Sequence, residues 1–273
     1  FSNVPIRKIW FGFTGFRVVW RCARRQILIS SHSRPLLIIP LFQRQCGSTA
    51  IFDGTAPDGS NGNPVADGVA ANCTGESLAD GRGIFATTAT NCYGISASSP
   101  GIEATTAIGC SGYSATGWGL RATDATNCHG KSERGIRGLY AANTATGCTG
   151  EIVIATGSTT NSAIGAYGLE TDSAIGCRGI IGAFTNSCIA IGIRATNASN
   201  SHGSAPGMGI SCTNAQNCTG EGDVVGILAT GTASFCCGTS DATAVLAGIA
   251  AACTAKSGTI VVSTANGRQL GTP

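Results

Sequence analysis

A nearly identical segment occurs three times between residues 83 and 130. The copies read G-I-F-A-T-T-A-T-N-C-Y-G from Gly83, G-I-E-A-T-T-A-I-G-C-S-G from Gly101 and G-L-R-A-T-D-A-T-N-C-H-G from Gly119. Their cysteines, Cys92, Cys110 and Cys128, follow one another at a spacing of 18 residues (110 − 92 and 128 − 110). A fixed period of this size is typical of repeat proteins, so the repeat constrains the fold before any other feature.

In two short stretches of each copy, positions that keep the same kind of residue from copy to copy alternate with positions that vary. Counted from the cysteine as position 0, position −8 is Ile or Leu and position −6 is mostly Ala, whereas position −7 varies, as in Phe85, Glu103 and Arg121. After the cysteine, Gly and often Ser occupy positions +2 and +4, with variable residues between them. A period of two indicates a β-strand with one buried face. We therefore predict two strands in each copy.

The position before the cysteine is Asn or Gly in most copies. The asparagines form a predicted column of turn residues: Asn72, Asn91, Asn127, Asn200 and Asn217. Asn and Gly share a tolerance of left-handed backbone geometry. We therefore expect a corner with positive φ between the two strands.

One copy is too short to bury its apolar face alone, but stacked copies can do so at a spacing of ~4.8 Å. We predict an all-β fold, a single-stranded right-handed parallel β-helix (β-solenoid) with coils of about 18 residues. It would occupy residues 46–264, after a basic, apolar and poorly ordered lead-in at 1–45 and before a polar tail at 265–273.

The cysteines fall at one inward position of the predicted coils. The predicted column consists of Cys73, Cys92, Cys110, Cys128, Cys148, Cys177, Cys188 and Cys218. Because Ala166 and Ser201 take the same position in other copies, we expect buried free thiols, which behave as small apolar groups. Disulfides between adjacent coils remain an alternative, since ~4.8 Å lies within the Cα separation that a bridge requires.

The register of residues 148–201 stays open. Ala166, Cys177 and Cys188 are separated by steps of only 11 residues (177 − 166 and 188 − 177). Cys148 and Cys188 are 40 residues apart (188 − 148), which also fits two coils of about 20 residues.

Runs such as A-T-N-C-Y-G-I-S-A-S-S-P-G-I-E-A resemble the repeats of bacterial right-handed parallel β-helix proteins, which are pectate-lyase-like in shape. The resemblance covers roughly Pro64–Gly238 and implies the right-handed solenoid. It implies no catalytic residue at any position of this sequence. Left-handed solenoids have coils of similar length, but their six-residue period is not visible here.

Charge is sparse and unevenly distributed along the chain. Residues 1–45 hold eight Lys or Arg and no Asp or Glu, so the remainder carries nine basic (17 − 8) and 14 acidic residues, a net charge of −5. We expect no nucleic-acid partner for this acidic repeat body. The apolar runs of the lead-in are shorter than the ~20 residues of a transmembrane helix, and no signal peptide is evident.

The titratable residues do not form a recognisable catalytic, cofactor or metal site. Two of the three histidines, His129 and His202, fall at position +1 of different coils, and acidic residues such as Glu103, Asp124 and Glu151 are scattered over outward positions. We expect no cofactor and no enzyme activity. A polysaccharide-acting enzyme of the parallel β-helix type is the alternative, and it would gather acidic residues on one face.

The outward faces of a long, weakly charged rod suit repeated contacts with a partner. We expect a structural or adhesive module of the extracellular space or cell surface, with glycans or surface proteins as partners. Ice binding is a second alternative because threonines recur at position −5, at Thr87, Thr105, Thr123, Thr196, Thr213 and Thr230. Threonine also suits strands for reasons of propensity alone.

Overall fold

The computed structural model describes residues 16–21, 26–31, 37–38, 68–72, 74–77, 80–155, 165–184 and 189–263. The chain forms two compact units, Phe1–Arg44 and Gln45–Pro273. In the first unit, strands β1 (Phe16–Arg21), β2 (Gln26–Ser31) and β3 (Leu37–Ile38) form an antiparallel sheet.

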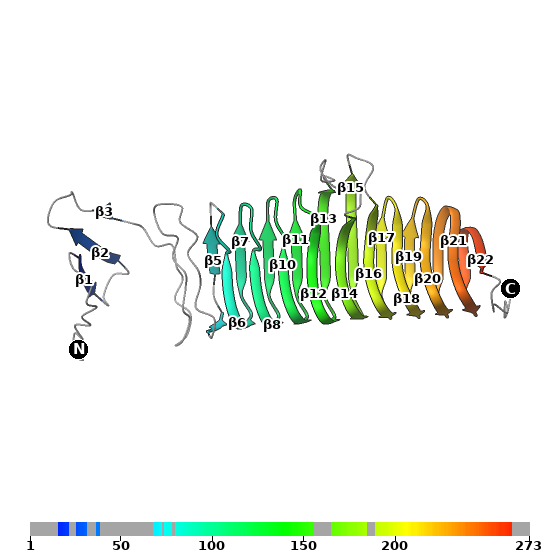
Figure 1. The fold of residues 1–273 in the computed structure, drawn as a ribbon, viewed down its shortest axis with the longest axis horizontal. Helices are drawn as coiled ribbons and strands as arrows, with labels where there is room; N and C mark the ends of the chain where they lie inside the picture. Colours follow the sequence, from blue (N-terminus) through cyan, green and yellow to red (C-terminus); the bar gives the residue numbers. More distant parts are fainter. Residues whose placement is uncertain are drawn as a thin grey trace. The chain divides into compact units, whose positions relative to one another are not determined.

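The second unit is a parallel β-solenoid whose coils stack in chain order (Figure 1). This confirms the predicted all-β solenoid with coils of about 18 residues. No helix occurs in the described residues, and so no helix there is long and apolar enough to cross a membrane. Its 19 strands are β4 (Val69–Ala71), β5 (Thr74–Ser77), β6 (Ile84–Thr90), β7 (Tyr93–Ser96), β8 (Ile102–Ile108), β9 (Ser111–Ser114), β10 (Leu120–Thr126), β11 (His129–Ser132), β12 (Arg137–Thr146), β13 (Thr149–Ala155), β14 (Ala166–Ile175), β15 (Arg178–Phe184), β16 (Ala190–Ser199), β17 (His202–Ala205), β18 (Met208–Gln216), β19 (Thr219–Gly222), β20 (Val225–Ser234), β21 (Cys237–Ala251) and β22 (Thr254–Val262).

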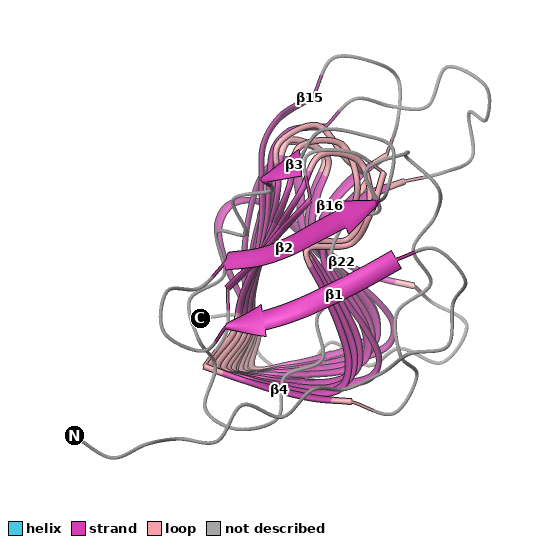
Figure 2. Cartoon of the chain, turned by 90° about the vertical axis from the view of Figure 1, so that its left-hand side faces the viewer, coloured by secondary structure: helices cyan, strands magenta, loops and turns pink. Residues whose placement is uncertain are grey.

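Most coils contribute one long strand and one short strand, and each pairs with its equivalent in the next coil. The long strand β10 pairs with β8 and β12, while the short strand β11 pairs with β9 and β13. The long strand bends in its middle. The bend shows in the pairing, which passes from Ala122 to Asp124 without including Thr123. Viewed along the axis, equivalent strands superpose around a narrow interior (Figure 2).

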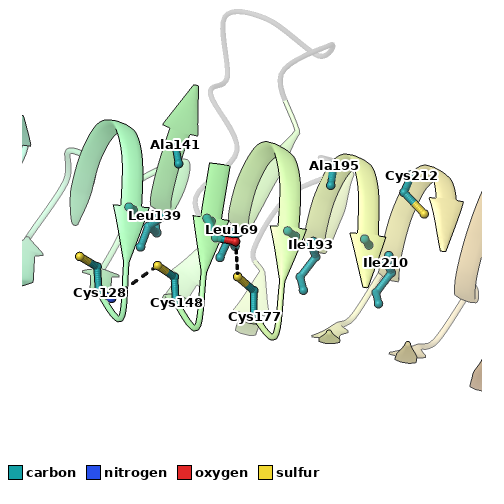
Figure 3. Packing of buried hydrophobic residues seen from close by; sticks show 14 of the residues in the cluster. Cys128, Leu139, Ala141, Cys148, Leu169, Cys177, Ile193, Ala195, Ile210 and Cys212 are labelled. Carbon is teal, nitrogen blue, oxygen red and sulfur yellow. Dashed lines mark hydrogen bonds between the residues drawn. The ribbon is translucent and has the colours of Figure 1, made fainter. Parts of the chain in front are cut away.

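The interior is built from columns of identical or similar side chains. Position −8 supplies its largest members, which are almost fully buried: Ile84, Ile102, Leu120, Leu139, Leu169, Ile193, Ile210, Ile227 and Val245. Figure 3 shows Leu139, Leu169, Ile193 and Ile210 on successive coils. Burying one such side chain stabilises a fold by about 1.5–3 kcal/mol, so this column is a principal source of stability.

Glycine and serine allow the short strand to approach the long one closely. A Cβ atom at Gly112 would overlap the carbonyl oxygen of Gly119, so position +2 accepts only glycine without a shift of the backbone. At position +4 the buried Ser114 Oγ donates to the carbonyl oxygen of Ser99 (2.8 Å) and accepts from the backbone N–H of Gly117 (2.9 Å). The hydroxyl is therefore satisfied inside the coil.

The pairing in the middle of the solenoid shows which positions of residues 148–201 belong to successive coils. Arg178 pairs with Thr149 on one side and with His202 on the other, so Cys148, Cys177 and Ser201 belong to successive coils. These steps span 29 (177 − 148) and 24 (201 − 177) residues. The predicted column residue Cys188 lies outside the described residues.

The larger coils also move Ala166 out of the cysteine position. Ala166 begins β14 and pairs with Ala190. It belongs to a second buried cluster with Ile152, Ile181, Ala190 and Ala205. Since Ile152 and Ile181 occupy the place that the inward serine takes in other coils, the interior there is apolar. Ala166 opens β14 and Cys177 lies just after its end in the same coil, so the 11-residue step between them is not a coil.

Candidate functional site

The predicted column of corner residues adopts left-handed backbone geometry. Asn72, Asn91, Asn127, Asn200 and Asn217 have φ between 50° and 54°. Gly109, Gly147 and Gly176 take the same position with φ of 60° or 61°. Phe235 and Ala252 also occupy it, with φ of 53° and 49°, and their residue types did not reveal this geometry in the sequence. The column turns the backbone and supplies no reactive constellation.

The cysteines of the predicted column that the structure describes are buried thiols, none of them in a disulfide. They are Cys92, Cys110, Cys128, Cys148, Cys177 and Cys218. Cys236 and Cys253 continue the column, whereas Ser201 interrupts it, and Cys73 lies outside the described residues. Cys128, Cys148 and Cys177 lie side by side in Figure 3, where the backbone N–H of Cys128 donates to the Cys148 Sγ (3.4 Å).

These thiols are held in a repeated hydrogen-bonding geometry, within which their pKa values shift in opposite directions. Hydrogen bonds with neighbouring cysteines lower the pKa of Cys128 and of Cys177. The Sγ of Cys92 donates to the carbonyl oxygen of Thr90 (3.2 Å), and the Sγ of Cys218 donates to that of Gln216 (3.2 Å). Hydrogen bonds with Cys128 and Cys177, together with burial, raise the pKa of Cys148. Burial raises the pKa of Cys212, which lies on the other side of the interior, to about 12. Cys148 and Cys212 therefore keep their protons, and a protonated, buried thiol is a poor nucleophile.

The structure does not bring the two described histidines together. His129 Nε2 lies 3.6 Å from Glu151 Oε2, whereas His202 belongs to β17, three coils further along. Within the described ranges, no group of three or more His, Cys, Asp or Glu side chains has the geometry of a metal site.

A different set of side chains forms a continuous network on the long-strand face. We call this set the arginine strip, and it consists of Arg82, Phe85, Glu103, Trp118, Arg121, Arg137, Tyr140, Tyr167, Glu170 and Arg194. Some members occupy position −7 and others precede the glycine that opens each copy. The sequence placed Glu103 and Arg121 at the variable position −7, but the second column beside it was missed.

Two glutamates each bridge two arginines from neighbouring coils. Glu103 accepts from Arg82 on one side and from Arg121 Nη1 (3.0 Å) on the other. Glu170 accepts from Arg137 and from Arg194 Nη1 (3.0 Å) in the same manner. Both glutamate side chains are only 15% exposed. Each carboxylate therefore has its charge largely compensated by protein groups.

Aromatic rings join the two bridged sets. The guanidinium carbons of Arg121 and Arg137 both lie 4.9 Å from the Trp118 ring centroid. Tyr167 contacts Arg137 (5.7 Å) and Arg194 (5.1 Å), and its hydroxyl accepts from Arg194 Nη1 (3.2 Å). Cation–π contacts of this kind contribute about 0.5–1 kcal/mol at exposed sites. Together with the ion pairs, these contacts make the strip continuous over successive coils, from the coil that contains Ile84 to the coil that contains Ile193.

The arginine strip is positively charged on an otherwise acidic body. Its four arginines and two glutamates leave a net charge of +2 (4 − 2). Arg121 and Arg194 are the most exposed of the four, at 45% and 52% of their side-chain surface. The strip can therefore offer positive charge and hydrogen-bond donors to a ligand.

An open cleft of about 370 Å³ lies on the side of the short strands and the turns that follow them. Its lining includes the carboxylates of Glu221, Asp223 and Asp241 and the hydroxyls of Ser204 and Ser257, but no basic residue.

No protein-family model matches the chain, and no curated protein or solved structure matches it. The pectate-lyase-like family that the repeats resemble therefore stays a prediction, whereas the parallel solenoid is seen directly.

Proposed function

We propose that the protein is a non-catalytic structural or adhesive module of the extracellular space or cell surface that binds glycans along its arginine strip. The observation that supports this most strongly is the continuity of the strip. Arg82, Glu103, Arg121, Arg137, Glu170 and Arg194 are linked through shared contacts on one face of successive coils.

Such a face suits a ligand that is itself a repeat. Each coil advances the equivalent outward position by ~4.8 Å, which is comparable to the length of one sugar residue in an extended chain. A chain laid along the axis can then contact several coils at once. Because the later contacts form within an existing complex, weak individual contacts add up to useful affinity.

A polysaccharide-acting enzyme of the parallel β-helix type is the second candidate. It is favoured by the acidic cleft, because glycoside hydrolysis commonly uses a pair of carboxylates. In that reaction one of the three acids, Glu221, Asp223 or Asp241, would protonate the leaving oxygen while another assisted the attack.

Ice binding receives less support from the geometry. The threonines at position −5 fall at the bend of the long strand, as pairing passes from Ala86–Ala104 to Thr88–Thr106 without including Thr87 and Thr105. A flat, regular array is what ordered water requires, and a bend does not offer it. Thermal hysteresis of the purified protein would test this alternative directly.

Glycan-array binding together with a polysaccharide-degradation assay separates the two main candidates. The proposed module binds glycans and releases no reducing ends or unsaturated products. Turnover that disappears in the Asp223→Asn and Asp241→Asn variants would overturn the non-catalytic proposal and place the reaction in the cleft.

A further inference from the structure

We propose that the arginine strip selects acidic glycans, chains that carry carboxylate or sulfate groups, and that Arg121 and Arg194 make the direct contacts. This inference rests on the proposed glycan-binding function and names the ligand class. It follows from the charge, the free donors, the rigidity and the spacing of these two arginines.

The first step concerns charge. Glu103 and Glu170 are each held between two arginines and are largely covered, so they present little negative charge to a ligand. Arg121 and Arg194 extend furthest into solvent, at 45% and 52% exposure. An approaching chain therefore meets positive groups first.

The second step concerns hydrogen bonding. An arginine side chain has five N–H donors. Among the described residues, the hydrogen bonds of Arg121 and Arg194 both leave from Nη1, toward Glu103 in one case and toward Glu170 and Tyr167 in the other. The remaining donors form a planar fork that matches a carboxylate or sulfate group.

The third step concerns rigidity. Arg121 is fixed between Glu103 and the Trp118 ring, and Arg194 between Glu170 and the Tyr167 ring. Groups held in their binding geometry lose little conformational entropy when a ligand arrives. The same contacts place guanidinium groups against the rings, where they compete with the stacking of neutral sugars or nucleic-acid bases.

The fourth step concerns spacing. Arg121 and Arg194 occupy equivalent positions three coils apart. Arg121 pairs with Tyr140, Tyr140 with Glu170, and Glu170 with Arg194. At ~4.8 Å per coil they are separated by roughly 14 Å along the axis. A linear glycan with regularly repeated acidic groups can reach both arginines, whereas a single acidic sugar can reach only one.

The test measures binding of the full chain to immobilised heparin, polygalacturonate and neutral dextran. We expect binding to the two acidic polymers, weakening as salt is raised, and none to dextran. Arg121→Gln and Arg194→Gln should each lower affinity by about tenfold, since a hydrogen bond to a charged group is of that order. Arg178→Gln is the matched control, because Arg178 is exposed on the short-strand face outside the strip.

Different failures have different meanings. If acidic glycans bind wild type but the strip variants bind equally well, the inference is wrong while glycan binding stands. If only neutral glycans bind, the preference for acidic glycans is wrong while glycan binding again stands. If no glycan binds, the proposed function itself fails, and direct binding of a single-stranded oligonucleotide would replace it with nucleic-acid binding. Arg194→Lys keeps the charge without the fork, and an undiminished affinity in this variant would refute the bidentate contact.

Discussion

The guanidinium carbon of Arg137 lies 4.9 Å from the ring centroid of Trp118, which belongs to the preceding coil. Arg137 also contacts the rings of Tyr140 and Tyr167 and pairs with Glu170. It therefore connects the part of the strip around Arg121 with the part around Arg194. Side chains from different coils, as well as backbone pairing, keep this face ordered.

Replacing Arg137 should disturb the strip more than replacing an ordinary surface arginine. Arg137 is only 19% exposed, and Arg137→Gln removes its ring contacts and leaves Glu170 with one cation fewer. We expect a loss of roughly 1–3 kcal/mol in the free energy of unfolding, measured in urea. The Arg178→Gln control should change it by less than about 0.5 kcal/mol. Equal effects of the two variants would show that Arg137 has no central role.

Shortening a residue of the Ile/Leu column should be more costly still. Leu139 is fully buried between Leu120 and Leu169, so Leu139→Ala leaves a cavity. The expected loss is about 2–5 kcal/mol. Tyr93→Ala is a suitable comparison, because Tyr93 is 44% exposed on the outer surface. A Leu139→Ala variant as stable as the Tyr93→Ala variant would contradict the stacked interior.

The corner position should tolerate glycine better than alanine. Asn127 has φ of 52°, a conformation that costs a residue with a Cβ roughly 1–2 kcal/mol unless it is Asn or Asp. Asn127→Gly should therefore remain near wild-type stability, whereas Asn127→Ala should unfold at lower urea concentration. Identical midpoints for the two variants would show that backbone geometry does not determine this position.

Stability should decrease in alkaline solution partly because of Cys212. Burial raises its pKa from the ordinary 9.0 to about 12, so the folded state retains a proton that the unfolded state loses. The stability that this proton contributes is complete below pH 9 and is lost as pH rises from 9 toward 12. Over this range the free energy of unfolding falls by about 1.4 kcal/mol per pH unit. Cys212→Ala should flatten the decline over this range, and an unchanged slope would contradict the assignment.

The buried thiols should be slow to react while the protein is folded. Cys92, Cys110, Cys128, Cys148 and Cys177 are at most 3% exposed. A water-soluble thiol reagent should label them only after denaturation, with Cys237 the first of the described cysteines to react because it is half-buried. Rapid labelling of Cys110 or Cys128 in the native protein would show that the coils open.

Local patterns were sufficient to predict the coil but not all of its stacking. The alternation around Ile102 and Ala104 and the repeated Asn or Gly before each cysteine specify strands and corners residue by residue. The register of residues 148–201 could not be predicted, because Ala166 imitates a repeat position in a lengthened coil. Only the pairing of Arg178 with Thr149 and His202 resolves it.

The arginine strip escaped prediction for a different physical reason. Trp118 and Arg137 precede the opening glycine of their copies, in a segment without a regular pattern. Their contacts depend on how long side chains of neighbouring coils pack, which the spacing of strand residues does not specify. In the sequence, position −7 was only a variable outward position, and nothing there indicated the rings that pack beside it.

Arginine footprinting in the presence of heparin tests the proposed ligand contact most directly. The full chain is modified with phenylglyoxal, with and without heparin, and the modified arginines are identified by mass spectrometry. Heparin should protect Arg121 and Arg194 while Arg178 reacts as before. Protection of Arg178 to the same degree, or unprotected Arg121 and Arg194 in a protein that has bound heparin, would contradict binding along the strip.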